Sequence, residues 1–431
     1  MKYIWFEIKR SFRMKETIGI WILIVLLVGF SQFSAMQESQ EQIFFPELEG
    51  MTVRDRQFFD YSQMNAEDVA RMEQINSWGQ TLESATPDLN DLLAYTSALS
   101  RLCSMTTPAS SQIDYDADGQ VIEEIITKHQ LFDYRSLQDK YDLAASVAWY
   151  EMLPSLNQVV QYVDLLAIKQ QTPLKRSEVT SGTAMIQFDR STMALAVPLV
   201  LAFLFFQDRR SRDKEGSEQA LMEIAGMKKR IGWQRLVAQI AVAMILVFSP
   251  FVVEQLVFGV IHGFSSWTYP MLVNAQSIQS FTSGLPLDGT VIETTTLGLT
   301  SISMDTLMHP QLLDFVDTWI VNGWIVFLFL FIIIWIVMLN TLISGLIKNM
   351  VAALLVRIGI VAVLLGIAFL IPNQWINVFN PLAYWNVVDI LSGNLHYSLL
   401  AGVAVCIGWI VLTGVGIALV ERKKLNSDKQ N

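Results

Sequence analysis

The sequence predicts an all-α membrane protein with six transmembrane helices, an N-terminal interfacial helix and a mainly helical extracellular domain inserted after the first transmembrane helix. The first observation is composition: 52% of the 431 residues are hydrophobic and only 16% are charged, whereas about a quarter of a typical soluble protein is charged. The second is a set of six apolar stretches long enough to cross a bilayer. The third is the concentration of Lys and Arg in alternate connecting segments.

The six apolar stretches define the expected spans. They cover 17–36, 190–207, 236–261, 318–342, 350–371 and 398–420. The first is interpreted as a retained anchor, because its apolar core from Ile18 to Phe33 is long for a secretory signal and no small-residue cleavage site follows it. The connecting segments are an interfacial helix at 1–16, a domain at 37–188, a cytoplasmic segment at 208–235, an outer loop at 262–317, a re-entrant or short-helix segment at 372–397 and a tail at 421–431.

Basic residues fix the expected orientation. Lys and Arg are frequent in 1–16, in 208–235 and after residue 420, but absent from 262–317 and 372–397. Short loops rich in Lys and Arg are retained on the cytoplasmic side. Both termini are therefore predicted to be cytoplasmic, in a multi-pass protein of the cell membrane.

The 37–188 segment is predicted to be extracellular, because a domain of this length crosses the membrane largely regardless of its charge. Apolar residues recur at helical spacing in 92–102 and again in 141–153. The segment is long enough to bury a core of its own.

One turn in this domain resembles part of a calcium loop. Asp114, Asp116 and Asp118 alternate and are followed by Gly119, as in the first half of such a loop. The twelfth position should be Glu, but it is Ile125. The alternating flanks favour an Asp-rich hairpin turn over a metal site.

Glu254 is the only acidic residue inside a predicted span. An unpaired carboxylate is costly in the bilayer, so its side chain should face the bundle interior, water or a partner chain. It is a candidate for the translocation path or for a dimer contact. The alternative is a structural hydrogen bond to a neighbouring helix.

Motifs for catalysis are absent from the sequence. It contains no phosphate loop, no His-Glu-x-x-His pair and no nucleophile elbow, so we expect no catalytic residue and no cofactor bound by this chain. The two cysteines, Cys103 and Cys406, fall in different compartments and cannot pair within the chain. The formal net charge of −10 argues against a nucleic-acid partner.

The N-terminal segment is predicted to lie on the membrane surface. Ile4, Ile8 and Phe12 form one helical stripe with Trp5 beside it, and basic residues occupy much of the remaining surface. This pattern is typical of an interfacial amphipathic helix in contact with lipid. The alternative is a positively charged flank that only anchors the first span.

The 208–235 segment is predicted to contain a short docking helix. Gly216 interrupts the chain and Ser217 can cap the helix that follows. Leu221 and Met222 contribute an apolar face before Gly226 ends the helix.

The order Lys214-Glu215-Gly216-Ser217-Glu218, then Leu221, a Gly break and a basic cluster, resembles the loop after the second helix in permeases of type-2 ATP-binding-cassette exporters. These permeases also begin with an interfacial helix, cross six times and commonly have an Asn-Pro stretch before the last helix. Here that stretch begins at Asn380-Pro381. The chain resembles a bacterial member with a large extracellular insert, because 37–188 is longer than in compact members.

The resemblance implies a transporter permease rather than an enzyme. Two permease chains, identical or different, would form the translocation path, and two copies of a separate ATPase subunit would bind ATP and magnesium. Residues 214–218 with Leu221 and Met222 would couple the ATPase to the spans, and Asn380-Pro381 would form an external turn. The apolar spans favour an amphipathic cargo such as a peptide, a lipid or a hydrophobic drug.

Two other classes of function compete with this interpretation. A membrane-anchored sensor or assembly subunit with a ligand-binding extracellular domain explains the large insert equally well, but explains the cytoplasmic helix and the Asn-Pro turn poorly. An intramembrane enzyme would need a nucleophile with its base or a metal site, and the sequence contains neither.

Overall fold

The computed structural model describes residues 2–41, 176–204, 228–284, 294–297, 299–303, 312–347, 349–372 and 375–427, with positions 162, 165–166, 168–171, 174 and 306. This part of the chain is mostly helical and contains five helices long and apolar enough to cross a membrane. They are α2 (Lys15–Glu41), α13 (Lys228–His262), α16 (Thr318–Leu346), α17 (Met350–Leu370) and α19 (Leu399–Ser427).

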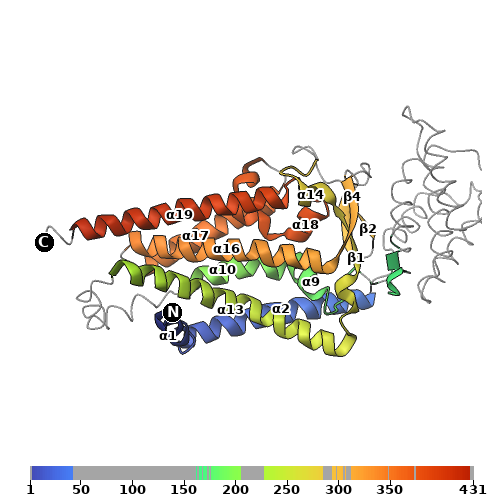
Figure 1. Cartoon of the computed structure of the whole chain (residues 1–431), viewed down its shortest axis with the longest axis horizontal. Helices are drawn as coiled ribbons and strands as arrows, with labels where there is room; N and C mark the ends of the chain where they lie inside the picture. Colours follow the sequence, from blue (N-terminus) through green and yellow to red (C-terminus); the bar gives the residue numbers. More distant parts are fainter. Residues whose placement is uncertain are drawn as a thin grey trace, which may run out of the picture.

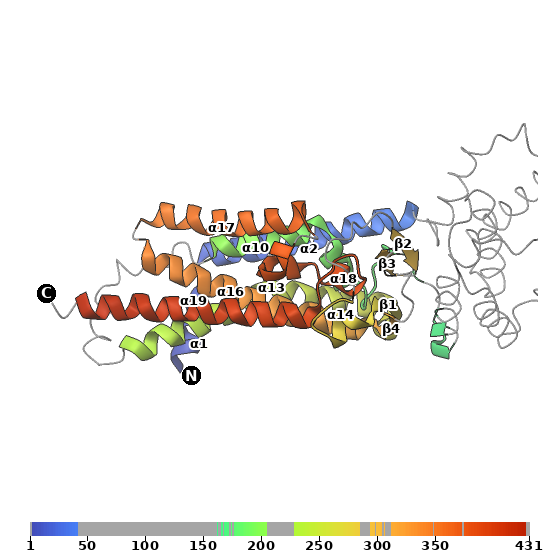
Figure 2. The same cartoon turned by 90° about the horizontal axis from the view of Figure 1, so that it is seen from above.

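The long helices form an elongated bundle, as the two perpendicular views show (Figures 1 and 2). At one end lie α1 (Lys2–Ser11) and the C-terminal end of α19. The opposite end carries the strands, α14 (Ala275–Gln279) and α18 (Val387–Leu391). The bundle therefore has two structurally different ends.

The central element is α16, which contacts α9, α10, α13, α17 and α19. It contains no charged residue, and Ile332, Ile333 and Ile336 are fully buried. A helix that is apolar on all sides can be packed by neighbours on every face. The interior of the bundle is therefore built around α16.

Glycines allow α16 and α19 to approach closely. A Cβ atom on Gly345 would lie 3.1 Å from Val420, one on Gly414 3.3 Å from Met338, and one on Gly416 3.1 Å from Leu342. Small residues at such interfaces let two helix backbones pack together within a membrane.

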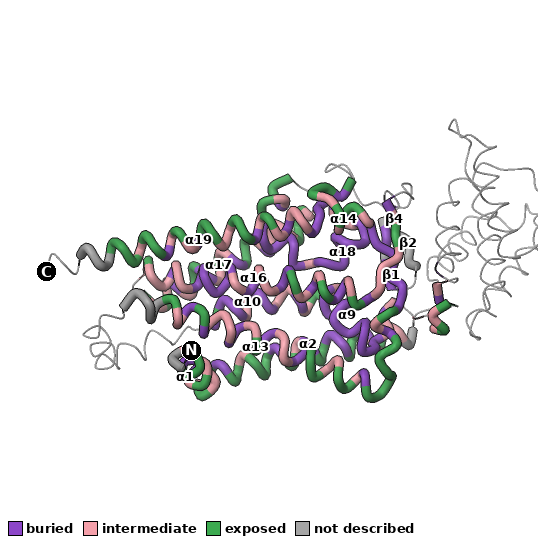
Figure 3. The backbone as a smooth tube through the Cα atoms, in the orientation of Figure 1, coloured by how far each residue is buried: buried purple, intermediate pink, exposed green. Residues whose placement is uncertain are grey.

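Large apolar side chains cover much of the outer surface of the bundle. Val260 of α13 is 84% exposed, and Leu26 of α2, Leu370 of α17 and Leu412 of α19 are also exposed. Green segments along the outer helices mark this surface in Figure 3. A surface of this kind is stable against lipid and unfavourable in water.

The second expected span is bent rather than straight. It consists of α9 (Ala184–Arg190), then the 3-10 helix η1 (Thr192–Leu195) and α10 (Ala196–Phe203), and the two parts meet at 70°. The expected 190–207 span began at this break. Residues before it, which were assigned to the extracellular domain, are helical and buried.

Two short antiparallel ribbons occupy the loop expected at 262–317. The first pairs β1 (Pro270–Asn274) with β4 (Leu313–Asp317), and Pro270 lies opposite Asp317. The second pairs β2 (Thr294–Leu297) with β3 (Thr300–Ser303). The expected 372–397 segment contains η4 (Trp375–Phe379), η5 (Pro381–Trp385) and α18.

Replacing Gly402 by Ala should destabilise the protein. The added Cβ would lie 2.8 Å from Cγ of Tyr384, whose ring is fully buried. Overpacking of this kind costs about 1–3 kcal/mol, and it should appear as a lower Tm in detergent. Gly408→Ala in the same helix is the control, because nothing lies within 4 Å of its Cβ. Equal Tm values for the two variants would contradict this packing.

Candidate functional site

The candidate site is the bend of the second span. Helix α9 ends at Arg190, and Ser191 is extended, with φ −79° and ψ 148°. The Ser191 hydroxyl donates to the carbonyl of Phe188 at 2.8 Å. A break of this kind frees backbone groups that a continuous helix would satisfy, so inside a membrane they need partners from the protein.

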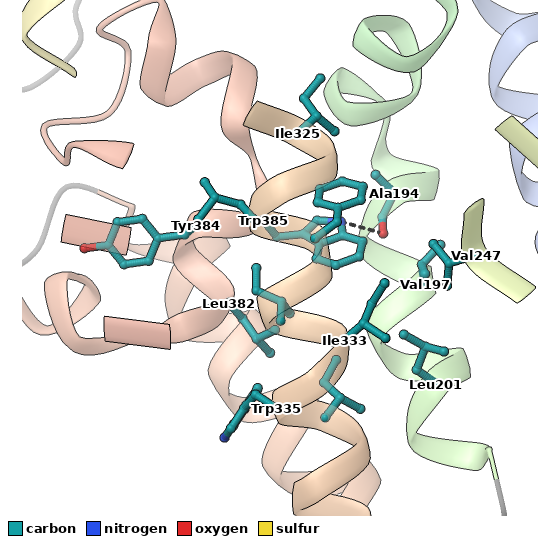
Figure 4. Close-up of a cluster of buried hydrophobic side chains, with 14 of the residues drawn as sticks. Ala194, Val197, Leu201, Val247, Ile325, Ile333, Trp335, Leu382, Tyr384 and Trp385 are labelled. Carbon is teal, nitrogen blue, oxygen red and sulfur yellow. Dashed lines mark hydrogen bonds between the residues drawn. The ribbon is translucent and has the colours of Figure 1, made fainter. Parts of the chain in front are cut away.

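Trp385 supplies one of these partners. Its indole Nε1–H donates to the carbonyl of Ala194 at 2.9 Å (Figure 4). The Trp385 ring is stacked on Phe329 of α16, with centroids 3.9 Å apart and planes 5° apart. Tyr384 points the opposite way in Figure 4 and donates to the carbonyl of Val378 at 2.9 Å. The adjacent aromatic residues thus fix η5 from two sides.

Asp189, one residue before the end of α9, holds α18. Its Oδ2 accepts a hydrogen bond from the backbone N–H of Val388 in α18 at 2.7 Å. The side chain is only 3% exposed, and Oδ1 has no hydrogen-bond partner among the described residues. A buried carboxylate with one unsatisfied oxygen is costly for folding.

Arg190 binds two further segments. Its Nη1 donates to the carbonyl of Leu299, between β2 and β3, at 2.8 Å. The same nitrogen donates to the carbonyl of Arg176 at 3.3 Å. Two successive residues at the bend therefore contact three separate segments of the chain.

Asn380 and Pro381, the expected external turn, lie at the start of η5. The Asn380 amide donates to the carbonyl of Leu364 in α17 at 2.8 Å, and its Oδ1 accepts from the N–H of Leu382 at 3.0 Å. Nearby, Asn377 donates to the carbonyl of Ile371 at 2.7 Å. Asn377 thus satisfies a carbonyl at the end of α17, and Asn380 bonds to a carbonyl within the helix; together they position η5 and its Trp385.

The described residues between 162 and 174, called the stem here, contact the segment between α13 and β1 and the end of β4. Lys169 forms an ion pair with Asp317 and donates to the carbonyl of Thr268 at 2.6 Å. The hydroxyls of Tyr162 and Tyr269 contact each other, and burial raises the pKa of both phenols above the usual value. These contacts fix the stem to the end of the bundle that carries the bend.

Helix α1 packs against α13 at the other end. Its Glu7 pairs with Arg235 at 3.4 Å, and both side chains are mostly buried. Ile8 and Phe12 pack against the main hydrophobic core, whereas Trp5 is exposed. One face of α1 therefore packs against the bundle, while Trp5 stays exposed.

Glu254 lies on α13, four residues after Pro250. Its Oε2 is buried and has no hydrogen-bond partner among the described residues. The described residues thus supply no structural hydrogen bond for this oxygen, although a hydrogen bond of that kind was the alternative to a functional role.

Two groups of expected site residues lie outside the described residues. One is the coupling segment with Lys214, Glu215, Gly216, Ser217, Glu218, Leu221 and Met222; the other is the calcium candidate with Asp114, Asp116 and Asp118. Within the part of the chain that the structure describes, no group of three or more His, Cys, Asp or Glu side chains could hold a metal ion.

Sequence reasoning missed Asp189, Arg190 and the role of Trp385. An Asp-Arg-Ser sequence directly before an apolar stretch looks like a polar flank at the membrane surface. The sequence offers one signal against that interpretation. The nearest preceding glycine, Gly182, lies seven residues before Asp189, so these polar residues do not sit beside a turn.

Replacing Asn380 by Ala should lower the free energy of unfolding by about 2–3 kcal/mol, because it leaves the buried N–H of Leu382 and the carbonyl of Leu364 without this partner. Asn349→Ala is the matched control: its side chain caps exposed N–H groups of Val351 and Ala352, a loss of about 1 kcal/mol. Denaturation in detergent measures both. An Asn380 variant no less stable than the control would contradict the buried role.

Comparison with known proteins finds no relative of this chain. The chain matches no family model, no curated protein and no solved structure at a significant level. The resemblance to exporter permeases therefore stays a prediction from the sequence, and function is argued from the residues of this chain.

Proposed function

We propose that this chain is the permease subunit of an ATP-binding-cassette exporter. Two permease chains, identical or homologous, form the translocation path, and two separate ATPase subunits bind ATP and magnesium. The observation that carries the proposal is the bend at Ser191, where a span is interrupted and its backbone is held by buried side chains. Interrupted helices at membrane depth occur where the break is buried in protein or lines a cavity, and they are common in transporters.

The arrangement of the ends supports the expected coupling route. Helix α10 ends and α13 begins toward the same end of the bundle as α1 (Figures 1 and 2). The coupling segment joins these two helices in the sequence, and Arg235 in the second turn of α13 is paired with Glu7 of α1. In the proposed function this end is cytoplasmic, so a push on the coupling segment reaches α10, α13 and α1 together.

The exported cargo is proposed to be amphipathic. The described spans offer mainly apolar surface; Glu254 and Arg357 lie in the central part of long helices, and Asp189 and Arg190 lie at the bend of the second span. Such a path suits a peptide, a lipid or a hydrophobic drug better than a small hydrated ion, which needs polar ligands along its route.

A sensor or assembly subunit is the second candidate, and the stem favours it. Lys169 and Tyr162, in the C-terminal part of the 37–188 insert, contact Asp317 and Tyr269 at the end of the bundle. A ligand-binding outer domain would need such an attachment to transmit a signal. Association with an ATPase subunit separates the two candidates, because a sensor does not require it.

Replacing Leu221 and Met222 by Asp should abolish co-purification of an ATPase subunit and ATP-dependent transport, because two charges would interrupt the apolar docking face. Gln219→Asp is the control, since it adds a charge at a polar position of the same segment. Pull-down of the tagged chain from its native membrane measures association. Retention of an ATPase by the double variant would contradict coupling through this segment, and failure of the unmodified chain to retain one would favour the sensor.

Glu254→Gln should slow transport without loss of folding, because the substitution removes the charge and keeps the shape of the side chain. The measurement is cargo efflux from proteoliposomes that contain the assembled complex. The Tm and the dimer fraction of the variant serve as controls. Unchanged efflux and unchanged assembly would show that Glu254 has neither a pathway role nor a dimer role.

A further inference from the structure

Two hydrogen bonds join the bend to the η5–α18 segment. Asp189 binds the N–H of Val388 at 2.7 Å, and Trp385 binds the carbonyl of Ala194 at 2.9 Å. Asp189 and Ala194 lie on opposite sides of the break, and Trp385 and Val388 lie three residues apart. Neither segment can therefore shift relative to the other without the loss of one or both hydrogen bonds.

Burial has two opposing effects on the Asp189 contact. In a low-dielectric interior a hydrogen bond to a carboxylate is stronger than in water. However, the second oxygen of Asp189 has no hydrogen-bond partner among the described residues, and a carboxylate held in this way would gain hydration if it were released. The bond to Val388 and the desolvation of the second oxygen therefore act in opposite directions on the stability of this contact.

The surroundings show which movement the contact restrains. Trp385 is stacked on Phe329 of the central helix α16, and Arg190 ties the same end of α9 to the carbonyl of Leu299. The side chains of α9 thus hold α18 on one side and the β2–β3 turn on the other. Release of Asp189 would free α18 from α9, leave α9 attached to the β2–β3 turn and leave the bond from Trp385 to Ala194 as the remaining contact of this pair.

We propose that Asp189 is the positioning residue of a latch that keeps the outer end of the bent span closed against residues 381–391. Loss of its bond to Val388 is the step that opens this end toward the outside. The proposal rests on the proposed function, which places this end of the bundle outside the cell. Asp189 acts through Trp385 and α18 and needs no contact with the cargo.

The test measures access to the bend in whole cells. Ala194, which is 1% exposed, is replaced by Cys in a chain carrying Cys103→Ser, and Cys406 is kept because it is fully buried. A membrane-impermeant maleimide is added from outside, and the rate of labelling is compared between chains with and without Asp189→Ala. Asp189→Asn keeps an oxygen that can accept from Val388 and is the conservative variant. Asp314→Ala, an exposed acid on β4, is the matched control.

We expect Asp189→Ala to raise the labelling rate of Cys at position 194 about tenfold, which corresponds to about 1.4 kcal/mol in the open–closed equilibrium. Asp189→Asn and Asp314→Ala should leave the rate near that of the parent. If Asp189→Ala does not accumulate in the membrane, Trp385→Phe takes its place, because it removes the donor to Ala194 and should raise the rate in the same direction.

Two results would overturn the latch. One refutes only the latch, and the other also refutes the proposed orientation of the bundle. An unchanged rate in Asp189→Ala, or in Trp385→Phe where that variant is used, refutes the latch alone if Cys introduced at Asp314 is labelled from outside. Failure to label Cys at position 314 would show that this end is not extracellular, which refutes the orientation in the proposed function together with the latch.

Discussion

Every backbone group freed inside an apolar bundle must find a partner, and this requirement governs the structure at the bend. The span that contains Asp189 and Ser191 is broken, and water would not be present at membrane depth to satisfy the exposed groups. A partner at the bend comes from Trp385, which donates to the carbonyl of Ala194, and Asn380 in the same segment between α17 and α19 bonds instead to the carbonyl of Leu364 in α17. The break and the outer segment therefore depend on each other.

The central helix α16 provides the frame on which these contacts are built. Phe329 fixes the plane of the Trp385 ring, and Asn322 and Asn340 donate to carbonyls of Gly182 and Leu201 on either side of the bend. A few polar side chains on an otherwise apolar helix thus hold both parts of the second span. This explains how a bent span can occupy a defined position in a bundle with few polar groups.

The helical membrane architecture could be predicted because it depends on local composition. Helix α16 contains no charged residue over its whole length, and such a stretch allows few alternatives. The bend could not be predicted, because its partners are distant: Ala194 and Trp385 are 191 residues apart, and Asp189 and Val388 are 199 apart. The resemblance to exporter permeases predicts a turn at Asn380-Pro381, but the bond of Asn380 to Leu364 depends on how α17 packs.

The short strands escaped prediction for a different reason. β2 and β3 have only four residues each, mainly Thr and Ser without a long alternation of apolar residues, and each strand has only one partner in the described sheets. A two-stranded ribbon gains its stability from the surface beneath it rather than from its own sequence. The β1–β4 ribbon is of this kind, because all five residues of β1 are buried.

The glycine contacts between α16 and α19 have a mechanical consequence. Side chains of the facing helix pack closely against Gly345, Gly414 and Gly416 and leave little room for sliding, so the two helices are expected to move as a single rigid body. Deformation during any working cycle would then concentrate in the elements outside this pair. Pro250 interrupts the hydrogen-bond ladder of α13 and makes that helix the natural place for a hinge.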